Sequence, residues 1–308
     1  MISWEQRIAK WYGDTDYQAE SEQELKKEYF FTAVRENNIE KLKSIAQNTP
    51  EVLTYKNNLR QSALHIACQP SKNKEGATEK SFETLKFLLK TLPKNAKDNN
   101  ETRFIDSRDC EGLSALMVAA DQGNPKHAKL LMTYHPNLKI EEYDSKRTIL
   151  HLAAQKNNPD FLHMILSART PAGVPVIKIN SACRSAEYRN WTAAHFAADN
   201  YAPDAMEALV EYGADVNAKT SFGKTPLMLA FESGSDRVAS YLLDLDQTNV
   251  LLVDSKGRTA YDYAVDYKAE PHTFAQLKKR ISEQAEKVVA KEDNILKVIQ
   301  MLSKQHTR

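Results

Sequence analysis

Gly223-Lys224-Thr225-Pro226-Leu227-Met228-Leu229-Ala230 is one of seven copies of a single pattern in this 308-residue chain. The copies align on one position, the anchor, which stands before a short apolar run and is Thr or Ser in six of them. The anchors are Glu28, Ser62, Ser114, Thr148, Thr192, Thr225 and Thr259. Successive anchors lie 34, 52, 34, 44, 33 and 34 residues apart. A period near 33 residues predicts a stack of similar supersecondary units, each of which buries its apolar face on its neighbours.

Each unit is expected to contain two helices. An Ala stands five residues after every anchor, where two helices can approach closely: Ala33, Ala67, Ala119, Ala153, Ala197, Ala230 and Ala264. Apolar pairs farther along five of the units, such as Leu209-Val210, indicate a second helix. Turn-forming residues stand two positions before four anchors, at Gly112, Asn190, Gly223 and Gly257. The pattern therefore predicts an all-α solenoid.

Residues 187–219 carry the most specific match to a known family. Trp191-Thr192-Ala193-Ala194-His195-Phe196-Ala197-Ala198 is followed by Leu209-Val210-Glu211-Tyr212-Gly213-Ala214-Asp215-Val216-Asn217-Ala218. This stretch resembles the ankyrin repeat, whose pattern is a turn, Thr-Pro-Leu-His-x-Ala-Ala, a short helix and a longer helix ending in paired leucines. The resemblance covers residues 25–270 and implies about seven helix-turn-helix units. It also implies that the chain binds other proteins.

The predicted array departs from the period at three insertions and at both ends. The insertions fall near 70–82, 91–105 and 168–186, and the last is predicted to form an extended finger. Insertions in repeat arrays fall on loops, often on the binding face. Glu28 in the first unit and Lys268 in the last replace family residues, as expected for terminal repeats that act as caps.

Residues 1–24 and 271–308 are predicted to be helical caps outside the repeats. Apolar residues at Trp4, Ile8, Trp11 and Tyr12 share one face of an N-terminal capping helix that ends at Gly13. Two apolar stripes separated by Asp293-Asn294 predict two C-terminal helices. The alternative for this end is a partner-binding or secretion-related tail, because residues 268–308 hold nine Lys and Arg against five Asp and Glu.

Composition excludes several classes of partner. The chain has 42 Lys and Arg, 41 Asp and Glu and a formal net charge of +1, so no global field attracts nucleic acid or an anionic membrane. No apolar run approaches the length of a membrane span, and the first residues lack the apolar core of a signal peptide. Three cysteines without metal-ligand spacing indicate reduced thiols. We therefore expect a cytoplasmic monomer without metal or cofactor.

Catalysis finds little support in the sequence, and the chain is expected not to be an enzyme. His65, His151 and His195 stand three residues after their anchors, and His65 precedes Cys68 by one helical turn. That histidine is a family consensus position, which implies hydrogen bonding near the turn of the adjacent unit. The remaining enzyme hypothesis is a cysteine-dependent activity in the insertions, with Cys110 or Cys183 as an exposed nucleophile.

The surface that repeats leave free is the predicted binding site. Loops before the anchors become basic and aromatic toward the C-terminus, and Tyr, Trp and Arg are enriched at binding hot spots. The predicted partner-binding residues are Arg147, Tyr188, Arg189, Trp191, Phe222, Lys224, Lys256 and Arg258. Trp191 and Arg189 are expected to be the anchors of the complex, with Trp191 outside the helix stack. Planar Arg suits carboxylate or phosphate, so the predicted partner is a protein with an acidic or phosphorylated surface.

Two further hypotheses rest on resemblance. Asn217, eight residues after Leu209, resembles sites in ankyrin repeats that an asparaginyl hydroxylase modifies; the alternative is a structural turn residue. Divergent arrays with Lys- and Asn-rich insertions are similar to effectors that intracellular bacteria secrete into a host cytosol. This chain is therefore either a resident scaffold or such an effector.

Overall fold

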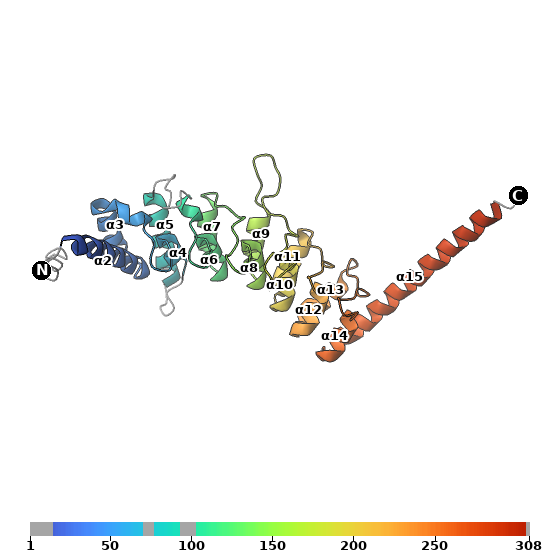
Figure 1. Cartoon of the computed structure of the whole chain (residues 1–308). Helices are drawn as coiled ribbons and strands as arrows, with labels where there is room; N and C mark the ends of the chain where they lie inside the picture. Colours follow the sequence, from blue (N-terminus) through green and yellow to red (C-terminus); the bar gives the residue numbers. More distant parts are fainter. Residues whose placement is uncertain (1–14, 70–76, 93–102, 306–308) are drawn as a thin grey trace. The chain divides into compact units, whose positions relative to one another are not determined.

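The computed structural model describes residues 15–69, 77–92 and 103–305 (Figure 1). Within these residues the chain forms fourteen α-helices and two short 3-10 helices, and its β-structure is confined to isolated bridges. It divides into two compact units, residues 1–144 and 145–308. The all-α repeat fold predicted from the sequence is confirmed.

The first unit contains three helix pairs, each with an inner helix followed by an outer helix. The pairs are α2 (Thr15–Arg35) with α3 (Ile39–Asn48), α4 (Ala63–Cys68) with α5 (Ala77–Thr91), and α6 (Ala115–Asp121) with α7 (Pro125–Met132). The 3-10 helices Pro50–Thr54 and Phe104–Asp106 follow the first and second pairs. Inner helix contacts inner helix and outer contacts outer, as in α4 with α6 and α5 with α7.

The second unit contains four helix pairs of the same kind. They are α8 (Ile149–Gln155) with α9 (Pro159–Leu166), α10 (Ala193–Asp199) with α11 (Pro203–Glu211), α12 (Pro226–Ser233) with α13 (Asp236–Asp244), and α14 (Ala260–Asp266) with α15 (Pro271–Gln305). Here α10 lies between α8 and α12, and α12 contacts α14.

Six of the seven anchor residues are the N-caps of inner helices. The side chains of Ser114 and Thr225 accept hydrogen bonds from the backbone N–H groups of Met117 and Met228, each at 3.3 Å. This N-cap satisfies a donor that has no partner within the helix. Outer helices start with Pro in four repeats, at Pro125, Pro159, Pro203 and Pro271. Pro fits there because the first helical N–H has no helical acceptor.

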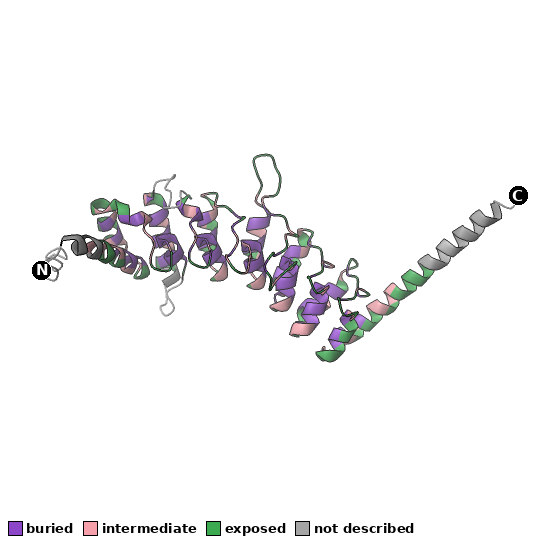
Figure 2. Cartoon of the chain, in the orientation of Figure 1, coloured by how far each residue is buried: buried purple, intermediate pink, exposed green. Residues whose placement is uncertain are grey.

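The seven repeated alanines form the seam between neighbouring repeats. All are at most 2% exposed, and the inner helices α4, α6, α8, α10 and α12 consist mostly of buried residues (Figure 2). A methyl side chain at this place lets two helix backbones approach. This close approach confirms the spacing argument made from the sequence.

The N-terminal boundary differs from the prediction. α2 runs without interruption from Thr15 to Arg35, so the expected border between residues 24 and 25 falls inside one helix. Glu28 lies in its interior and begins no helix. The polar segment before Glu28 has no Gly or Pro to stop the helix, which explains the continuity. The predicted capping helix around Trp4 and Trp11 lies outside the described residues.

The C-terminal prediction of two helices is wrong. α15 is one helix of 35 residues that passes through Asp293 and Asn294. Asp and Asn inside a helix cost less than about 1 kcal/mol each relative to Ala, so they need not end it. The start of α15 is the outer helix of the seventh repeat: Gln276 and Arg280 donate to Asp244 (2.5 Å) and to the Leu245 carbonyl (2.8 Å).

The insertions are only partly within the described residues. α5 already begins at Ala77, so the insertion predicted near 70–82 ends before it. The third insertion contains a short hairpin in which Arg169 pairs with Pro175 and the Val176 N–H donates to the Ala168 carbonyl at 3.1 Å. This loop projects beyond α9 in Figure 1, as the predicted finger would.

Ala153→Leu tests the seam. Ala153 is 0% exposed, so the three added carbons must push apart α8 and α10. We expect a loss of about 1–3 kcal/mol in the free energy of unfolding, measured by urea denaturation. Ala285→Leu, at an exposed position of α15, is the matched control and should change little. Equal unfolding curves for parent and Ala153→Leu would contradict the seam.

Candidate functional site

The loops that precede the inner helices, here called fingers, are joined by backbone hydrogen bonds. In the first unit, the Cys110 N–H donates to the Leu59 carbonyl at 2.9 Å. In the second unit, the N–H groups of Ser221 and Ser255 donate to the carbonyls of Arg189 (3.0 Å) and Phe222 (2.9 Å). Each carbonyl belongs to the residue just before the position with positive φ. Successive fingers within a unit are therefore held in register.

Gly223 shows why the fingers need residues that tolerate positive φ. Its φ is +75°, and a Cβ atom there would lie 2.8 Å from the backbone nitrogen of Ser255 on the next finger. Asn190 and Lys146 occupy the equivalent place in other fingers with φ of 64° and 55°. Gly adopts this conformation without strain, and Asn tolerates it better than most residues.

Three of the predicted binding residues are bound within the second unit. Arg147, Lys224 and Arg258 each stand one position before an anchor and reach the residue seven positions after it. Their partners are Gln155 (2.6 Å), Glu232 (2.5 Å) and Asp266 (3.5 Å). We call this contact the finger-to-helix clasp. It holds the finger over the end of its inner helix.

Arg258 is the most heavily engaged of the three. Its guanidinium carbon lies 4.1 Å from the centre of the Tyr263 ring, and its Nε lies 3.4 Å from Asp254. By contrast, Arg189 and Lys256 are exposed. Some basic residues of the fingers therefore make contacts within the chain, and others are exposed to solvent.

Trp191 does not project from the fingers as expected. Its ring packs against Tyr188 (5.4 Å between centroids) and against the buried Phe196 (5.2 Å), and the indole is only partly exposed. Tyr188 also contacts Phe196, at 5.1 Å. Trp191→Ala would therefore disturb packing as well as any complex. Spacing places Trp191 on a finger but does not determine which way its ring turns.

Phe222 is the exposed apolar side chain among the predicted residues, with 61% exposure. Other exposed apolar side chains escaped the sequence-based prediction: Tyr29, Leu59, Tyr201, Val253, Val265 and Tyr267. Val265 lies on α14, the last inner helix described, and Tyr267 is the C-cap of that helix. Their position in the last repeat is the sequence feature that could have predicted their exposure.

The three repeated histidines join neighbouring repeats. In each, Nδ1 accepts a hydrogen bond from the backbone N–H of its own anchor, at 3.0–3.1 Å. Nε2 faces a carbonyl of the following loop: Leu113 for His65 (3.0 Å), Ser181 for His151 (3.1 Å) and Ala218 for His195 (3.1 Å). The neutral tautomer with hydrogen on Nε2 satisfies both contacts. The structural role implied by the family resemblance is what this geometry provides.

Burial disfavours the charged form of two of these histidines, His65 and His195. It lowers the pKa of His195 to about 4 and lowers the pKa of His65 below its ordinary value. His127, on α7, has its pKa lowered by burial too. His65, His127 and His195 are each 0% exposed. They serve packing and do not face solvent where a substrate would bind.

The cysteines differ in exposure. Cys68 is buried, and burial raises the pKa of its thiol, which opposes formation of a nucleophilic thiolate. Cys183, expected to be exposed, is buried; its thiol donates to the Ser145 carbonyl at 2.7 Å. That contact fixes the loop because it takes the place of a finger-to-finger backbone bond. Cys110 is exposed, as the prediction allowed.

Asn217 connects two loops. Its Nδ2 donates to the Gln247 carbonyl at 2.7 Å, and its Oδ1 accepts from the Asn249 N–H at 2.8 Å. A hydroxylase would have to break both contacts to reach this side chain. Hydroxylation at Asn217 stays a prediction.

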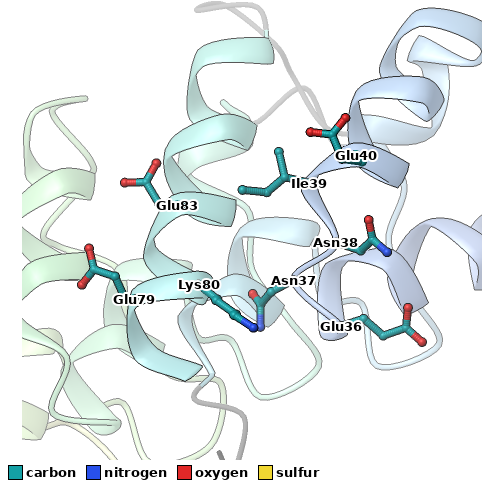
Figure 3. A pocket seen from close by; sticks show the side chains of 8 residues that line it. All are labelled: Glu36, Asn37, Asn38, Ile39, Glu40, Glu79, Lys80 and Glu83. Carbon is teal, nitrogen blue, oxygen red and sulfur yellow. The ribbon is translucent and has the colours of Figure 1, made fainter. Parts of the chain in front are cut away.

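Figure 3 shows a pocket of about 480 Å³ in the first unit, between the α2–α3 turn and α5. Its four carboxylates each pair with a lysine: Glu36 with Lys41, Glu40 with Lys43, Glu79 with Lys126 and Glu83 with Lys86. These exposed pairs neutralise the lining. Within the described residues, no group of His, Cys, Asp or Glu is placed to hold a metal ion. No described helix is both long and apolar enough to cross a bilayer.

Paired helices, finger loops and a histidine joint in successive repeats define a helical-repeat protein. The family model for ankyrin repeats in three copies matches overlapping stretches at 30–140, 74–174, 137–220, 173–254 and 194–277. The chain therefore belongs to the ankyrin-repeat family.

Known relatives share parts of this array. The chain is 27% identical to inversin of Canis lupus familiaris over 166 residues, which is 52% of this chain and 14% of inversin. It is 35% identical to the NF-kappa-B inhibitor cactus of Drosophila melanogaster over 96 residues, which is 29% of this chain and 19% of cactus. The matches thus span a small part of each relative.

Solved structures show the same fold. The ankyrin repeat domain of Bcl-3, described as a member of the IkappaB protein family, has a TM-score of 0.59 and 19% identity, covering 81% of this chain and 97% of that domain. The ankyrin repeat domain of human ASB11 has the same TM-score and identity, covering 82% and 96%.

Stability should fall in mild acid because of the buried histidines. Their pKa in the folded chain lies below that of the unfolded chain, so the unfolded state binds protons first as the pH falls. Their contribution is complete above about pH 6.5 and declines below it; for His195, whose folded-state pKa is about 4, the decline approaches about 1.4 kcal/mol per pH unit. Urea unfolding at pH 7 and pH 5 measures the loss.

The control for this experiment is His272→Gln, which removes an exposed histidine and should keep the parental pH dependence. His195→Gln should weaken folding at pH 7 and reduce the loss between pH 7 and pH 5. An unfolding midpoint that does not move between the two pH values would contradict the argument.

Proposed function

We propose that this chain binds other proteins through the fingers of its second unit and has no catalytic activity of its own. The observation that supports this is the neighbouring pair Arg189 and Phe222, on consecutive fingers joined through the Ser221 N–H. Both side chains are exposed, and Phe222 is 61% exposed. An exposed apolar ring and an exposed guanidinium on adjoining fingers are a combination that protein interfaces favour.

The competing enzyme hypothesis loses Cys183, one of its two candidate nucleophiles, to a structural role. Cys68 and Cys183 are buried, and the repeated histidines have both ring nitrogens engaged. Cys110 is exposed, but a nucleophile also requires an oriented base. Binding is the better-supported function.

Fewer basic residues are available to a partner than the sequence predicted, because Arg147, Lys224 and Arg258 are bound within the chain. Arg189 and Lys256 are exposed and available for an acidic or phosphorylated group. Three free cysteines suit a reducing cytosol, either that of the producing cell or that of a host. Inversin, cactus and Bcl-3 share the fold and are consistent with a binding role.

Phe222→Ala and Arg189→Ala test this function with partners captured by the intact chain. Each variant should weaken the purified complex, by about 2 kcal/mol or more where the residue is a hot spot, as isothermal titration would measure. Val174→Ala, on the inserted loop and 57% exposed, is the comparison and should bind as the parent does. Loss of binding at Val174 alone would move the interface to the insertion.

A further inference from the structure

The finger-to-helix clasp is replaced by a different arrangement in one repeat of the second unit. In the repeat anchored at Thr192, Trp191 occupies the position that holds Arg147, Lys224 or Arg258 in the other three. The residue seven positions after the anchor is Asp199, which corresponds to Glu232 and Asp266. This repeat therefore keeps the carboxylate of the clasp and lacks its cation.

Asp199 lies at the end of α10 and is half-buried. It accepts one hydrogen bond, from the neighbouring Asn200 side chain at 3.4 Å, and the ion pairs of the described residues do not include it. Burial raises its pKa, and the charge of Glu232 raises it further, whereas Lys224 lowers it. A second cation near Asp199 would stabilise its ionised form.

Aromatic rings lie beside this carboxylate. Tyr188 and Trp191 meet edge to face at 5.4 Å between centroids, and each keeps part of its surface exposed. Burial is the largest cause of a raised pKa at Tyr188, followed by Glu187; Arg147 lowers it, and the charge of Asp199 raises it. Tyr188 and Trp191 both pack on Phe196, which lies one helical turn before Asp199 on α10, so the rings and the carboxylate share one side of this repeat.

Cations cover aromatic rings elsewhere in the chain: Lys278 lies 4.4 Å from the Phe274 centroid, and two arginines come closer to their rings. Arg258 stacks on Tyr263 at 4.1 Å while it pairs with Asp254 and Asp266. In the first unit, Arg108 stacks on the Tyr143 ring at the same distance. In both cases a planar guanidinium covers an aromatic face, and this stacking is stronger for Arg than for a compact, strongly hydrated ammonium.

We propose that Tyr188, Trp191 and Asp199 form a binding site for an arginine side chain of a partner protein. This inference rests on the proposed function and adds the chemistry of one contact. The guanidinium would stack on the exposed part of the rings and donate to the Asp199 carboxylate, completing the clasp between molecules. Glu232, bound by Lys224, adds a second carboxylate nearby and disfavours an anionic group here. The partner then carries an arginine for this site and an acidic group for Arg189.

The test uses the full chain labelled with 5-fluorotryptophan and observed by fluorine NMR. The chain has three tryptophans, and Trp191→Phe identifies the resonance of Trp191. N-acetyl-arginine amide is titrated as the probe, and N-acetyl-citrulline amide is its uncharged control. We expect a saturable shift of the Trp191 resonance with the arginine probe and about tenfold weaker binding of the citrulline probe.

Two variants identify the carboxylate. Asp199→Asn should weaken the arginine probe by about tenfold, whereas Glu207→Gln, which removes one exposed charge from the outer helix of the same repeat, should not. Equal binding of both probes, binding unaffected by Asp199→Asn, or no shift of Trp191 overturns the arginine site. None of these outcomes tests the role of Phe222 and Arg189. The proposed function is tested separately, by Phe222→Ala and Arg189→Ala.

A variant that supplies the missing cation gives an independent readout. Trp191→Arg should form the clasp with Asp199 inside the chain, so it should unfold at higher urea than Trp191→Gln, and Asp199→Asn should abolish that difference. Both substitutions lose the same ring packing, which leaves the cation as the variable. An equal midpoint for Trp191→Arg and Trp191→Gln would show that position 191 does not face the carboxylate, which contradicts the site.

Discussion

The close approach of neighbouring repeats is the constraint on which each unit depends. Alanines on the inner helices bring the backbones together, and this places each histidine within reach of a carbonyl on the next loop. The same approach puts consecutive fingers within hydrogen-bond distance, so their tips need residues that accept positive φ. The alanine seam, the histidine hydrogen bonds and the finger-to-finger hydrogen bonds therefore depend on one another. A larger side chain in the seam would weaken all three.

That device also decides which charges remain available for binding. A finger held in register over its inner helix brings a basic residue and an acidic residue of one repeat together, as in Lys224 with Glu232. Such a contact neutralises charges that a sequence profile counts as surface. Arg189 is not neutralised in this way, because it lies at the finger tip, two positions before the residue that occupies the clasp position. Surface charge thus depends on the position within the repeat more than on the number of Lys and Arg residues.

The repeat period predicted what depends on local spacing and missed what depends on side-chain direction. Six of the seven anchors and the seam alanines follow from a fixed offset within each unit, and the structure has them where they were expected, as it has the histidines whose role the family resemblance implied. The inward turn of the Trp191 ring does not follow, because a finger aromatic can pack on Phe196 or face solvent with the same spacing. Cys183 was placed correctly in its insertion, but its burial depends on a carbonyl 38 residues away. The continuous α15 shows that Asp and Asn are weak terminators when no Gly or Pro accompanies them.

In a repeat array, residues that depart from the repeated pattern say more about function than residues that follow it. Residues that recur at one offset are explained by stacking, since every repeat faces the same neighbours. Position 191 is different: three repeats of the second unit place a cation there, and one places an indole while keeping the carboxylate that the cation would meet. Stacking supplies no reason for that combination, because the clasp would hold this finger as well as the others. A partially buried carboxylate beside two aromatic rings is costly to keep without a cation, so the most direct physical reason for the exchange is that the cation comes from another molecule.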